Sequence, residues 1–305
     1  TIEKFINEVG RDIPDPQTSM SVWERSRAQQ IVNGSPVQRI ELTNRPDLRI
    51  GALGSGSDYT PFLQHLGIAS LNIGFGGEDG SGTYHSIYDS YSHYFKFSDP
   101  GFKYGIALSK VCGHSVLRLA NAEVLPFDFA NFADTVSVYV NEVTRLADSL
   151  REDAKTSNQM ISSGMWRAVQ DPTDNLATPK LKSEVPNINF EPLKNALAKL
   201  KNSAAEYQKA AAGKQLSVSE RKTLDDILYK SERMLTRTEG LPRRDWFRHQ
   251  IYAPGFYTGY GVKTLPGVRE ALEQREWTEA QEQILIVSRT IEGFAAQIDR
   301  AAKLY

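Results

Sequence analysis

Residues 128–150 read DFANFADTVSVYVNEVTRLADSL, and this stretch decides the fold of the second half of the chain. Apolar side chains recur in it at spacings of four and three residues, as they do along one face of an α-helix. They are Phe132, Val136, Tyr139, Val143, Leu146 and Leu150. Asp128 stands before them and has the side chain of a good N-cap. The stretch therefore predicts a long amphipathic helix that begins after Asp128.

Two later stretches repeat this apolar periodicity. The first contains Leu193, Leu197, Leu200, Ala204 and Tyr207, and the second contains Ile284, Val287, Ile291, Phe294 and Ile298. Several amphipathic helices with short polar connections are typical of an all-α domain. We place this domain at residues 127–305, with the irregular residues 169–189 as a surface excursion.

Residues 1–126 have a mixed pattern. The sequence IGALGSGSD (50–58) predicts a strand and a glycine turn, and GIASLNIGF (67–75) predicts a buried strand. Between them, Asp58 is expected to cap a helix that begins at about Pro61. Residues 97–121 predict another helix, with Ser98 as its cap. A strand, a turn, a helix and a second strand are typical of an α/β domain with parallel strands.

Composition excludes several classes of protein. The chain has 305 residues, 40% of them hydrophobic, and a formal net charge of −1. A protein with so small a net charge has no global electrostatic field that attracts nucleic acid, so we do not expect nucleic acid as a partner. Cys112 is the single cysteine, which excludes intrachain disulfides and cysteine-rich zinc modules. The chain opens TIEKF, without an initiator Met or a signal segment, which is typical of a processed or excised piece.

Three features carry residues that are suited to chemistry. In GTYHSIYDSY (82–91), His85 follows a glycine-rich loop, and is either a packed side chain or a ligand at the rim of a site. The turn GSGSD (54–58) is either a tight turn or a place where the backbone approaches a ligand. Tyr260 lies in the long irregular segment 249–267, where it either packs or binds an anionic group. His65 and His114 lie within predicted helices and are expected to have structural roles. For His93 and His249 the sequence leaves both a structural and a functional role open.

Four segments in this order resemble one known family. They are GSGSDYTPFLQHLGIAS (54–70), TYHSIYDSYSHYFKFSDPGFKYG (83–105), LRLANAEVLPFDFANFAD (117–134) and IYAPGFYTGYGVKTLPGVREAL (251–272). Together they resemble the C-terminal part of the glutamate carboxypeptidase II and transferrin receptor family, and the compact glycine loop resembles bacterial members. The resemblance implies the C-terminal part of a zinc peptidase α/β domain at residues 1–126. It also implies a helical dimerisation domain at 127–305, through which the protein forms a homodimer.

The resemblance also implies roles for individual residues. Active members hold two Zn²⁺ ions that activate a water and polarise the peptide carbonyl. His85 matches the last zinc ligand, and Tyr84 matches a tyrosine whose hydroxyl supports the developing oxyanion. Ser55 and Gly56 match positions that line the substrate cleft, and Tyr260 matches a tyrosine that binds the terminal carboxylate of the peptide substrate.

The chain departs from the glutamate-selective members at four positions. Gly259 stands where those members carry a lysine, and Asn72 and Gly74 stand where they carry arginines. Ser57 occupies a substrate-binding position that is an asparagine there. Because the missing cations would hold acidic substrate groups, we expect a broader peptidase that prefers neutral or apolar residues.

The remaining zinc ligands and the general base of this family lie upstream of the segment that the chain resembles. We therefore expect an upstream N-terminal polypeptide of the same precursor to complete the site, and expect this chain alone to be inactive. Two alternatives are a receptor-like member that only binds, and a module that serves dimerisation alone. Family members usually act outside the cytoplasm, so an extracytoplasmic location is expected.

Overall fold

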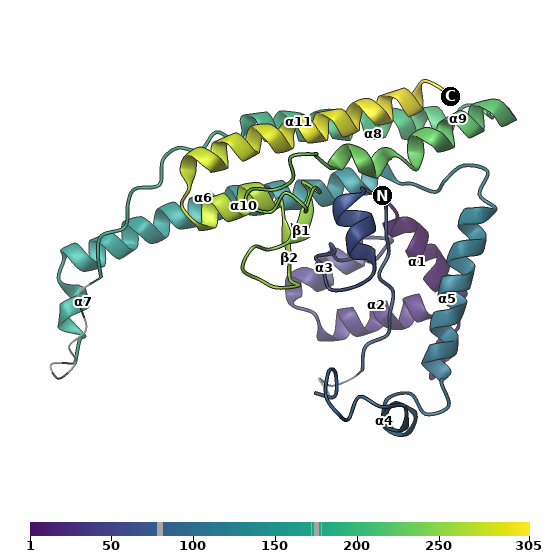
Figure 1. The fold of residues 1–305 in the computed structure, drawn as a ribbon, viewed down its shortest axis with the longest axis horizontal. Coiled ribbons are helices and arrows are strands. Elements are labelled where there is room, and N and C mark those ends of the chain that lie inside the picture. The colour runs from purple at the N-terminus through teal and green to yellow at the C-terminus, as the bar shows by residue number, and fades with distance from the viewer. Residues whose placement is uncertain (78–81, 172, 174–176, 178) are drawn as a thin grey trace. The chain divides into compact units, whose positions relative to one another are not determined.

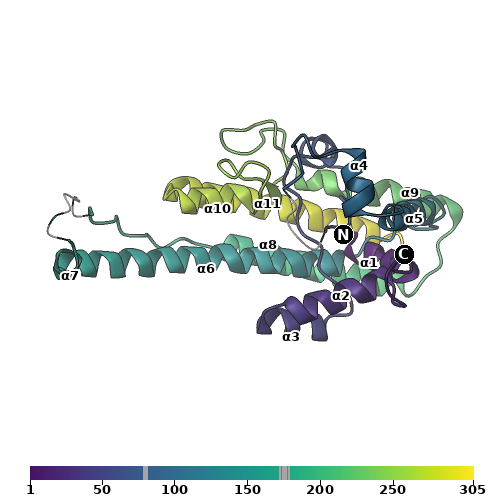
Figure 2. The same cartoon turned by 90° about the horizontal axis from the view of Figure 1, so that it is seen from below.

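The computed structural model describes residues 1–77, 82–171, 173, 177 and 179–305. These residues form two compact units, and each is described here by itself (Figures 1 and 2). Unit 1 consists of Thr1–Gly51, Ala69–Asn131 and Ser217–Tyr229, and unit 2 consists of Ala52–Ile68, Phe132–Leu216 and Lys230–Tyr305. The domain boundary between residues 126 and 127 remains a prediction.

Unit 1 is built from helices around a small apolar core. Its elements are α1 (Glu3–Asp12), α2 (Val22–Asn33), α3 (Pro36–Asn44), α4 (Tyr91–His93), the π-helix η2 (Tyr94–Ser98), α5 (Lys103–Ala120) and α9 (Val218–Leu228). The core lies between α1 and α5, which are neighbours in Figure 1, and contains Phe5, Val9, Ile13, Ala107 and Val111. The helices α2 and α3 bury no residue completely.

Serine residues begin α2 and α3. Ser21 accepts a hydrogen bond from the backbone N–H of Glu24, whose side chain accepts one from the N–H of Ser21. Ser35 and Gln38 make the same reciprocal pair at the start of α3. Each pair satisfies backbone donors that a helix leaves open at its first turn, and so fixes where the helix begins.

The start of α5 corrects the prediction that Ser98 caps this helix. Ser98 lies in η2, and α5 begins at Lys103 after Phe102, which has a left-handed backbone. The carboxylate of Asp99 accepts hydrogen bonds from the N–H groups of Tyr104 and Gly105, at 3.1 and 2.8 Å. A carboxylate suits this place better than a hydroxyl because it accepts two bonds and meets the positive end of the helix dipole.

The expected parallel strands at residues 50–58 and 67–75 are not formed. Among the described residues, the only sheet pairs β1 (Tyr252–Pro254) with β2 (Val262–Thr264), in antiparallel register and within unit 2. A parallel strand needs a neighbouring strand for its hydrogen-bond ladder, and no other strand lies in the described part of the chain. The helix expected between those segments is confirmed as a π-helix, η1 (Pro61–His65), but no side chain caps it.

Unit 2, together with the start of α6 in unit 1, confirms the helical pattern of the second half. Asp128 accepts a hydrogen bond from the N–H of Asn131 at 2.9 Å, so it caps α6 (Phe129–Ser162) as predicted. The other elements are α7 (Met165–Ala168), α8 (Glu191–Ala211), the 3₁₀-helix η3 (Ser231–Leu235), α10 (Pro266–Glu273) and α11 (Trp277–Ala302). The predicted apolar residues of α8 and α11 are all buried, and Figures 1 and 2 show these two helices side by side.

Burial along α8 and α11 contributes to the stability of unit 2. Leu193, Leu200, Ile284, Ile291 and Phe294 are completely buried. Each such side chain contributes about 1.5–3 kcal/mol when it leaves water. In the described part of the chain, no helix has the length and apolar character that crossing a membrane requires.

Candidate functional site

The glycine turn and Tyr260 lie against each other in unit 2. The N–H of Ser55 donates to the carbonyl of Tyr260 at 3.3 Å. Gly56 has a φ of +96°, and a Cβ placed on it would lie 2.7 Å from the ring of Tyr260. Only glycine combines this backbone with this approach. The structure thus brings together Ser55, Gly56 and Tyr260, three of the six predicted site residues.

Ser57 completes this turn and leads into η1. Its carbonyl accepts hydrogen bonds from the N–H and the hydroxyl of Thr60, at 3.0 and 2.7 Å. Its side chain is exposed, as is Tyr260 at 69%. The turn therefore presents small residues and one tyrosine ring to solvent.

The buried side chain of Gln64 stabilises the glycine turn through hydrogen bonds, and the sequence pattern did not predict this role. Its side chain is completely buried, and its Nε2 donates to the carbonyls of Leu53 and Gly54 at 2.9 and 3.0 Å. The backbone carbonyl of Gln64 accepts a hydrogen bond from the N–H of Arg248 at 2.8 Å. The sequence offers one signal for this role, a glutamine in the short helix that begins at Pro61, soon after the glycine turn at 54–58.

The loop that carries Tyr260 is braced along its length. It connects β1 to β2, and the N–H of Gly255 donates to the carbonyl of Gly261 at 2.8 Å. The hydroxyl of Thr258 donates to the same carbonyl at 2.7 Å. The long irregular segment expected here is therefore a short hairpin with a closed loop, which holds Tyr260 in one place.

A buried ion pair fixes the base of this loop. Arg244 and Glu270 pair at 2.5 Å with side chains that are 9% and 8% exposed. Arg244 also donates to the carbonyl of Pro254 at 2.6 Å, and Glu270 accepts from the N–H of Phe256 at 2.6 Å. Burial lowers the pKa of Arg244, and the charge of Glu270 opposes this shift. Sequence reasoning missed this pair because both residues are common on exposed surfaces.

His249 has a structural role, which decides between its two sequence interpretations. It is completely buried, its Nε2 lies 3.0 Å from Glu232, and its Nδ1 accepts from the N–H groups of Ile251 and Tyr252. The hydroxyl of Tyr252 donates to Glu232 at 2.5 Å. Burial and the Glu232 carboxylate raise the pKa of Tyr252 well above its ordinary value. This cluster anchors the start of β1.

Tyr84 and His85 lie in unit 1. Their rings stack at a centroid distance of 3.8 Å, and Tyr84 is 73% exposed. His85 has a φ of +58°, a left-handed backbone that costs a residue with a Cβ about 1–2 kcal/mol. Such residues are concentrated at functional sites, where the surrounding structure holds the strain.

The described residues do not by themselves form a metal site. No group of three His, Cys, Asp or Glu side chains that could hold a metal ion occurs among them. His85 supplies one imidazole, whereas zinc takes three or four protein ligands. His65 instead stacks on Trp246 at 5.0 Å and bonds its carbonyl, in agreement with the structural role expected of it.

The residues at which the chain differs from the glutamate-selective members are exposed or have free space beside them. Gly259 has a φ of +58°, and a Cβ on it would meet no atom within 4 Å. Gly74 is equally unobstructed, and Asn72 is exposed. None of these three residues carries a charge.

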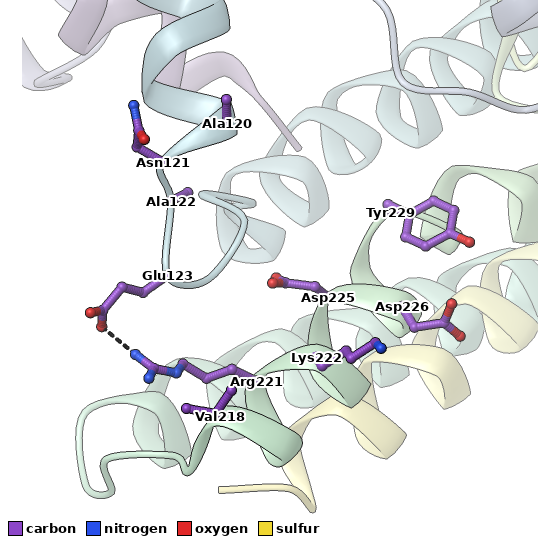
Figure 3. A pocket seen from close by; sticks show the side chains of 10 residues that line it. All are labelled: Ala120, Asn121, Ala122, Glu123, Val218, Arg221, Lys222, Asp225, Asp226 and Tyr229. Carbon is purple, nitrogen blue, oxygen red and sulfur yellow. Dashed lines mark ion pairs between the residues drawn. The ribbon is translucent and has the colours of Figure 1, made fainter.

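A separate hollow of about 600 Å³ lies in unit 1, between the end of α5 and α9. Figure 3 shows Glu123 and Arg221 joined across it by an ion pair of 2.7 Å. Asp225 on its wall accepts from the N–H of Leu125 at 3.0 Å. The lining contains neither histidine nor cysteine and none of the six predicted residues.

Comparisons with known proteins agree with this architecture. The family model of the transferrin receptor-like dimerisation domain matches residues 188–299. The chain is 32% identical over 245 residues to the probable glutamate carboxypeptidase LAMP1 of Arabidopsis thaliana, which covers 78% of this chain and 30% of that protein. It is 35% identical over 246 residues to a probable glutamate carboxypeptidase of Arthroderma benhamiae, covering 79% and 29%.

A more distant relative carries a different activity in its name. The chain is 26% identical over 272 residues to the aminopeptidase NAALADL1 of Mus musculus, covering 84% of this chain and 32% of that protein. The chain thus spans less than a third of the length of these curated relatives. They come from a plant, a fungus and a mammal, and give no support to the bacterial likeness of the glycine loop.

Proposed function

Because the chain belongs to the glutamate carboxypeptidase II and transferrin receptor family, we propose that it is the C-terminal portion of a two-zinc metallo-exopeptidase of the carboxypeptidase type. The observation that carries this proposal is the similarity to relatives named as peptidases. An upstream polypeptide of the same precursor supplies the zinc ligands and the general base that the described residues lack. The 305-residue chain alone is then inactive.

In this proposal each predicted residue has one task. His85 supplies one zinc ligand, and the neighbouring hydroxyl of Tyr84 donates to the oxyanion that develops on the peptide carbonyl. Two zinc ions in the completed site would supply an activated water and polarise that carbonyl. The left-handed backbone of His85 and the stacking of the two rings support this pairing, because they fix one side chain relative to the other.

Substrate binding falls to the glycine turn and Tyr260. The exposed hydroxyl of Tyr260 donates to the terminal carboxylate of the peptide, while Ser55, Gly56 and Ser57 line the cleft beside it. The hydrogen bond between Ser55 and Tyr260 and the buried pair below the loop support this role, because they hold the ring in place before substrate arrives. The absence of a cation at Gly259, Asn72 and Gly74 favours neutral or apolar substrate residues.

The match to a dimerisation domain supports a homodimer through the helical part of unit 2. It also favours a second candidate function, a receptor-like or dimerisation scaffold that has lost its chemistry. An extracytoplasmic location remains part of the proposal. The scaffold and the enzyme differ in whether the complete protein hydrolyses a peptide.

The test uses this chain together with the polypeptide that the same gene encodes upstream of Thr1. Tyr260→Phe removes only a hydroxyl, and we expect it to raise KM at least about tenfold for peptides with a free C-terminus. His85→Ala should abolish hydrolysis, whereas substitution of His93, a half-buried histidine in α4, by alanine should not. Unchanged hydrolysis by the His85→Ala complex would refute the proposed role, and no hydrolysis by the unsubstituted complex would favour the scaffold.

A further inference from the structure

One buried side chain connects the two segments that carry the predicted substrate-binding residues. Gln64 lies in η1 and is completely buried. Its Nε2 donates to the carbonyls of Leu53 and Gly54, which lead into the glycine turn. Its backbone carbonyl accepts hydrogen bonds from the N–H groups of Arg248 and His249, at 2.8 and 3.2 Å. These two residues lie shortly before β1, so Gln64 holds the turn and the base of the β1–β2 hairpin at a fixed separation.

The turn and the hairpin approach each other closely. A Cβ on Gly54 would lie 2.2 Å from the carbonyl oxygen of Tyr260 and 3.0 Å from the nitrogen of Val262. A direct hydrogen bond between the two segments, from Ser55 to Tyr260, is 3.3 Å long. This length is beyond the usual range of N–H···O bonds, so the bond is weak. The separation that places the Tyr260 ring therefore depends on the shorter bonds that Gln64 makes to both segments.

The amide of Gln64 contributes little net stability. Two carbonyl oxygens need a donor, so Nε2 faces them, and Oε1 is left buried without a partner among the described residues. A buried acceptor without a partner costs roughly as much free energy as one or two hydrogen bonds contribute. Gln64 also lies in a π-helix, an element that is rare and occurs frequently at functional sites. Both observations favour a residue whose role is to position its neighbours.

We propose that Gln64 is a positioning residue for the recognition of the terminal carboxylate of the substrate, and that it acts through Tyr260. This role rests on the proposed function, in which the Tyr260 hydroxyl donates to that carboxylate. A hydroxyl must lie about 2.5–3.0 Å from its acceptor, so a shift of the hairpin by about 1 Å removes this bond. Gln64 is buried and does not touch the substrate itself. The expected effect is therefore on substrate binding and not on the chemical step.

The experiment compares variants of the complete product of the gene that encodes this chain, with a peptide that has a free C-terminus as substrate. Gln64→Met keeps the unbranched shape of glutamine but donates no hydrogen bond. The control is Gln250→Met, because Gln250 is 1% exposed and its side chain donates to the carbonyl of Arg248, near the same hairpin. We expect Gln64→Met to raise KM at least about tenfold with kcat changed less than about threefold, and the control to change KM less than about twofold. Circular dichroism of each variant checks that it folds.

A double-mutant cycle distinguishes a positioning role from a merely structural one. If Gln64 acts through Tyr260, Gln64→Met should raise KM less than about twofold in the Tyr260→Phe background, because the hydroxyl that it positions is absent there. An equal rise of KM in both backgrounds, or a fall of kcat by the same factor as the rise of KM, would overturn the inference.

Hydrogen exchange tests the separation of the turn and the hairpin without a substrate. In the complete protein, we expect Gln64→Met to speed exchange of the Ser55 N–H at least about tenfold, whereas Gln250→Met should change it less than about twofold. Unchanged exchange at Ser55 would overturn the inference, whatever the protein hydrolyses. Faster exchange in a protein that hydrolyses no peptide would sustain the role of Gln64 in the separation and remove the proposed function. If Gln64→Met does not fold, Gln64→Glu, which places an acceptor where the two carbonyls need a donor, takes its place in both assays.

Discussion

Replacing Arg244 with methionine tests whether the buried ion pair holds the loop that carries Tyr260. Methionine approximates the apolar stem of arginine but lacks the guanidinium group, and so leaves Glu270 as a buried charge without its partner. The removal of one partner from a buried pair costs about 3–5 kcal/mol, since the remaining carboxylate has lost its water and its counter-charge. The donor bond from Arg244 to the carbonyl of Pro254 is lost as well.

The neighbouring arginine provides a matched control. Arg243 makes a two-pronged pair with Glu279 at 2.7 and 2.9 Å, but its side chain is 43% exposed. An exposed pair of this kind contributes only about 0.2–1 kcal/mol because water screens it. Arg243→Met should therefore lower the free energy of unfolding by less than a third of the loss caused by Arg244→Met.

Urea unfolding of the 305-residue chain, followed by tryptophan fluorescence, measures both variants. Trp246 lies two residues from Arg244 and reports on this region. If the two substitutions lower the free energy of unfolding by the same small amount, the Arg244–Glu270 pair does not stabilise the loop as the structure indicates. If Arg244→Met destabilises strongly but Glu270→Gln does not, the hydrogen bond from Arg244 to the carbonyl of Pro254, and not the pairing with Glu270, holds the loop.

Three further predictions concern single residues. Gly56→Ala should lower the free energy of unfolding by about 1–3 kcal/mol, because its Cβ meets the Tyr260 ring and its φ is positive, whereas Gly74→Ala should change it by less than about 0.5 kcal/mol in the same urea assay. Asp99→Ala should cost about 1–2 kcal/mol and reduce the helical circular dichroism signal, because α5 loses its cap; an unchanged melting curve would refute this. Burial acts to raise the pKa of Asp15, but hydrogen bonds from the Gln17 N–H, Arg25 and Thr18 outweigh it and lower that pKa. The stability from Asp15 is then complete above about pH 4 and lost as the pH falls through the lowered value, so the difference in unfolding free energy between the wild type and Asp15→Asn should shrink in acid.

Helical elements were the part of the fold that the sequence predicted well. The stripes of α6, α8 and α11 were recognisable because each helix buries one face, and Asp128 stands where the N-cap belongs. Residues 50–58 and 67–75 have strand-like sequences, but a strand forms only against a neighbour, and the described residues provide none. Periodicity reports the face that a segment buries and does not report whether its partner is present.

The candidate site was predictable where glycine and aromatic residues marked it. Gly56 and Tyr260 were both expected, and the structure gives the reason, since the ring packs where a side chain at Gly56 would stand. The supporting residues Gln64, Arg244 and Glu270 were missed because polar side chains usually face water. Arg244 and Glu270 bond to Pro254 and Phe256 at the hairpin between β1 and β2, which pairs residues eight to twelve positions apart across an irregular sequence.

Native mass spectrometry of the chain with its upstream polypeptide tests the central claim most directly. We expect a complex that carries two zinc ions per site, and a reduced zinc content in the His85→Ala complex while the dimer persists. The His93→Ala complex should keep both ions. A complex without zinc, or one whose zinc content is the same with and without His85, would contradict the claim that this chain contributes a ligand to a two-zinc peptidase.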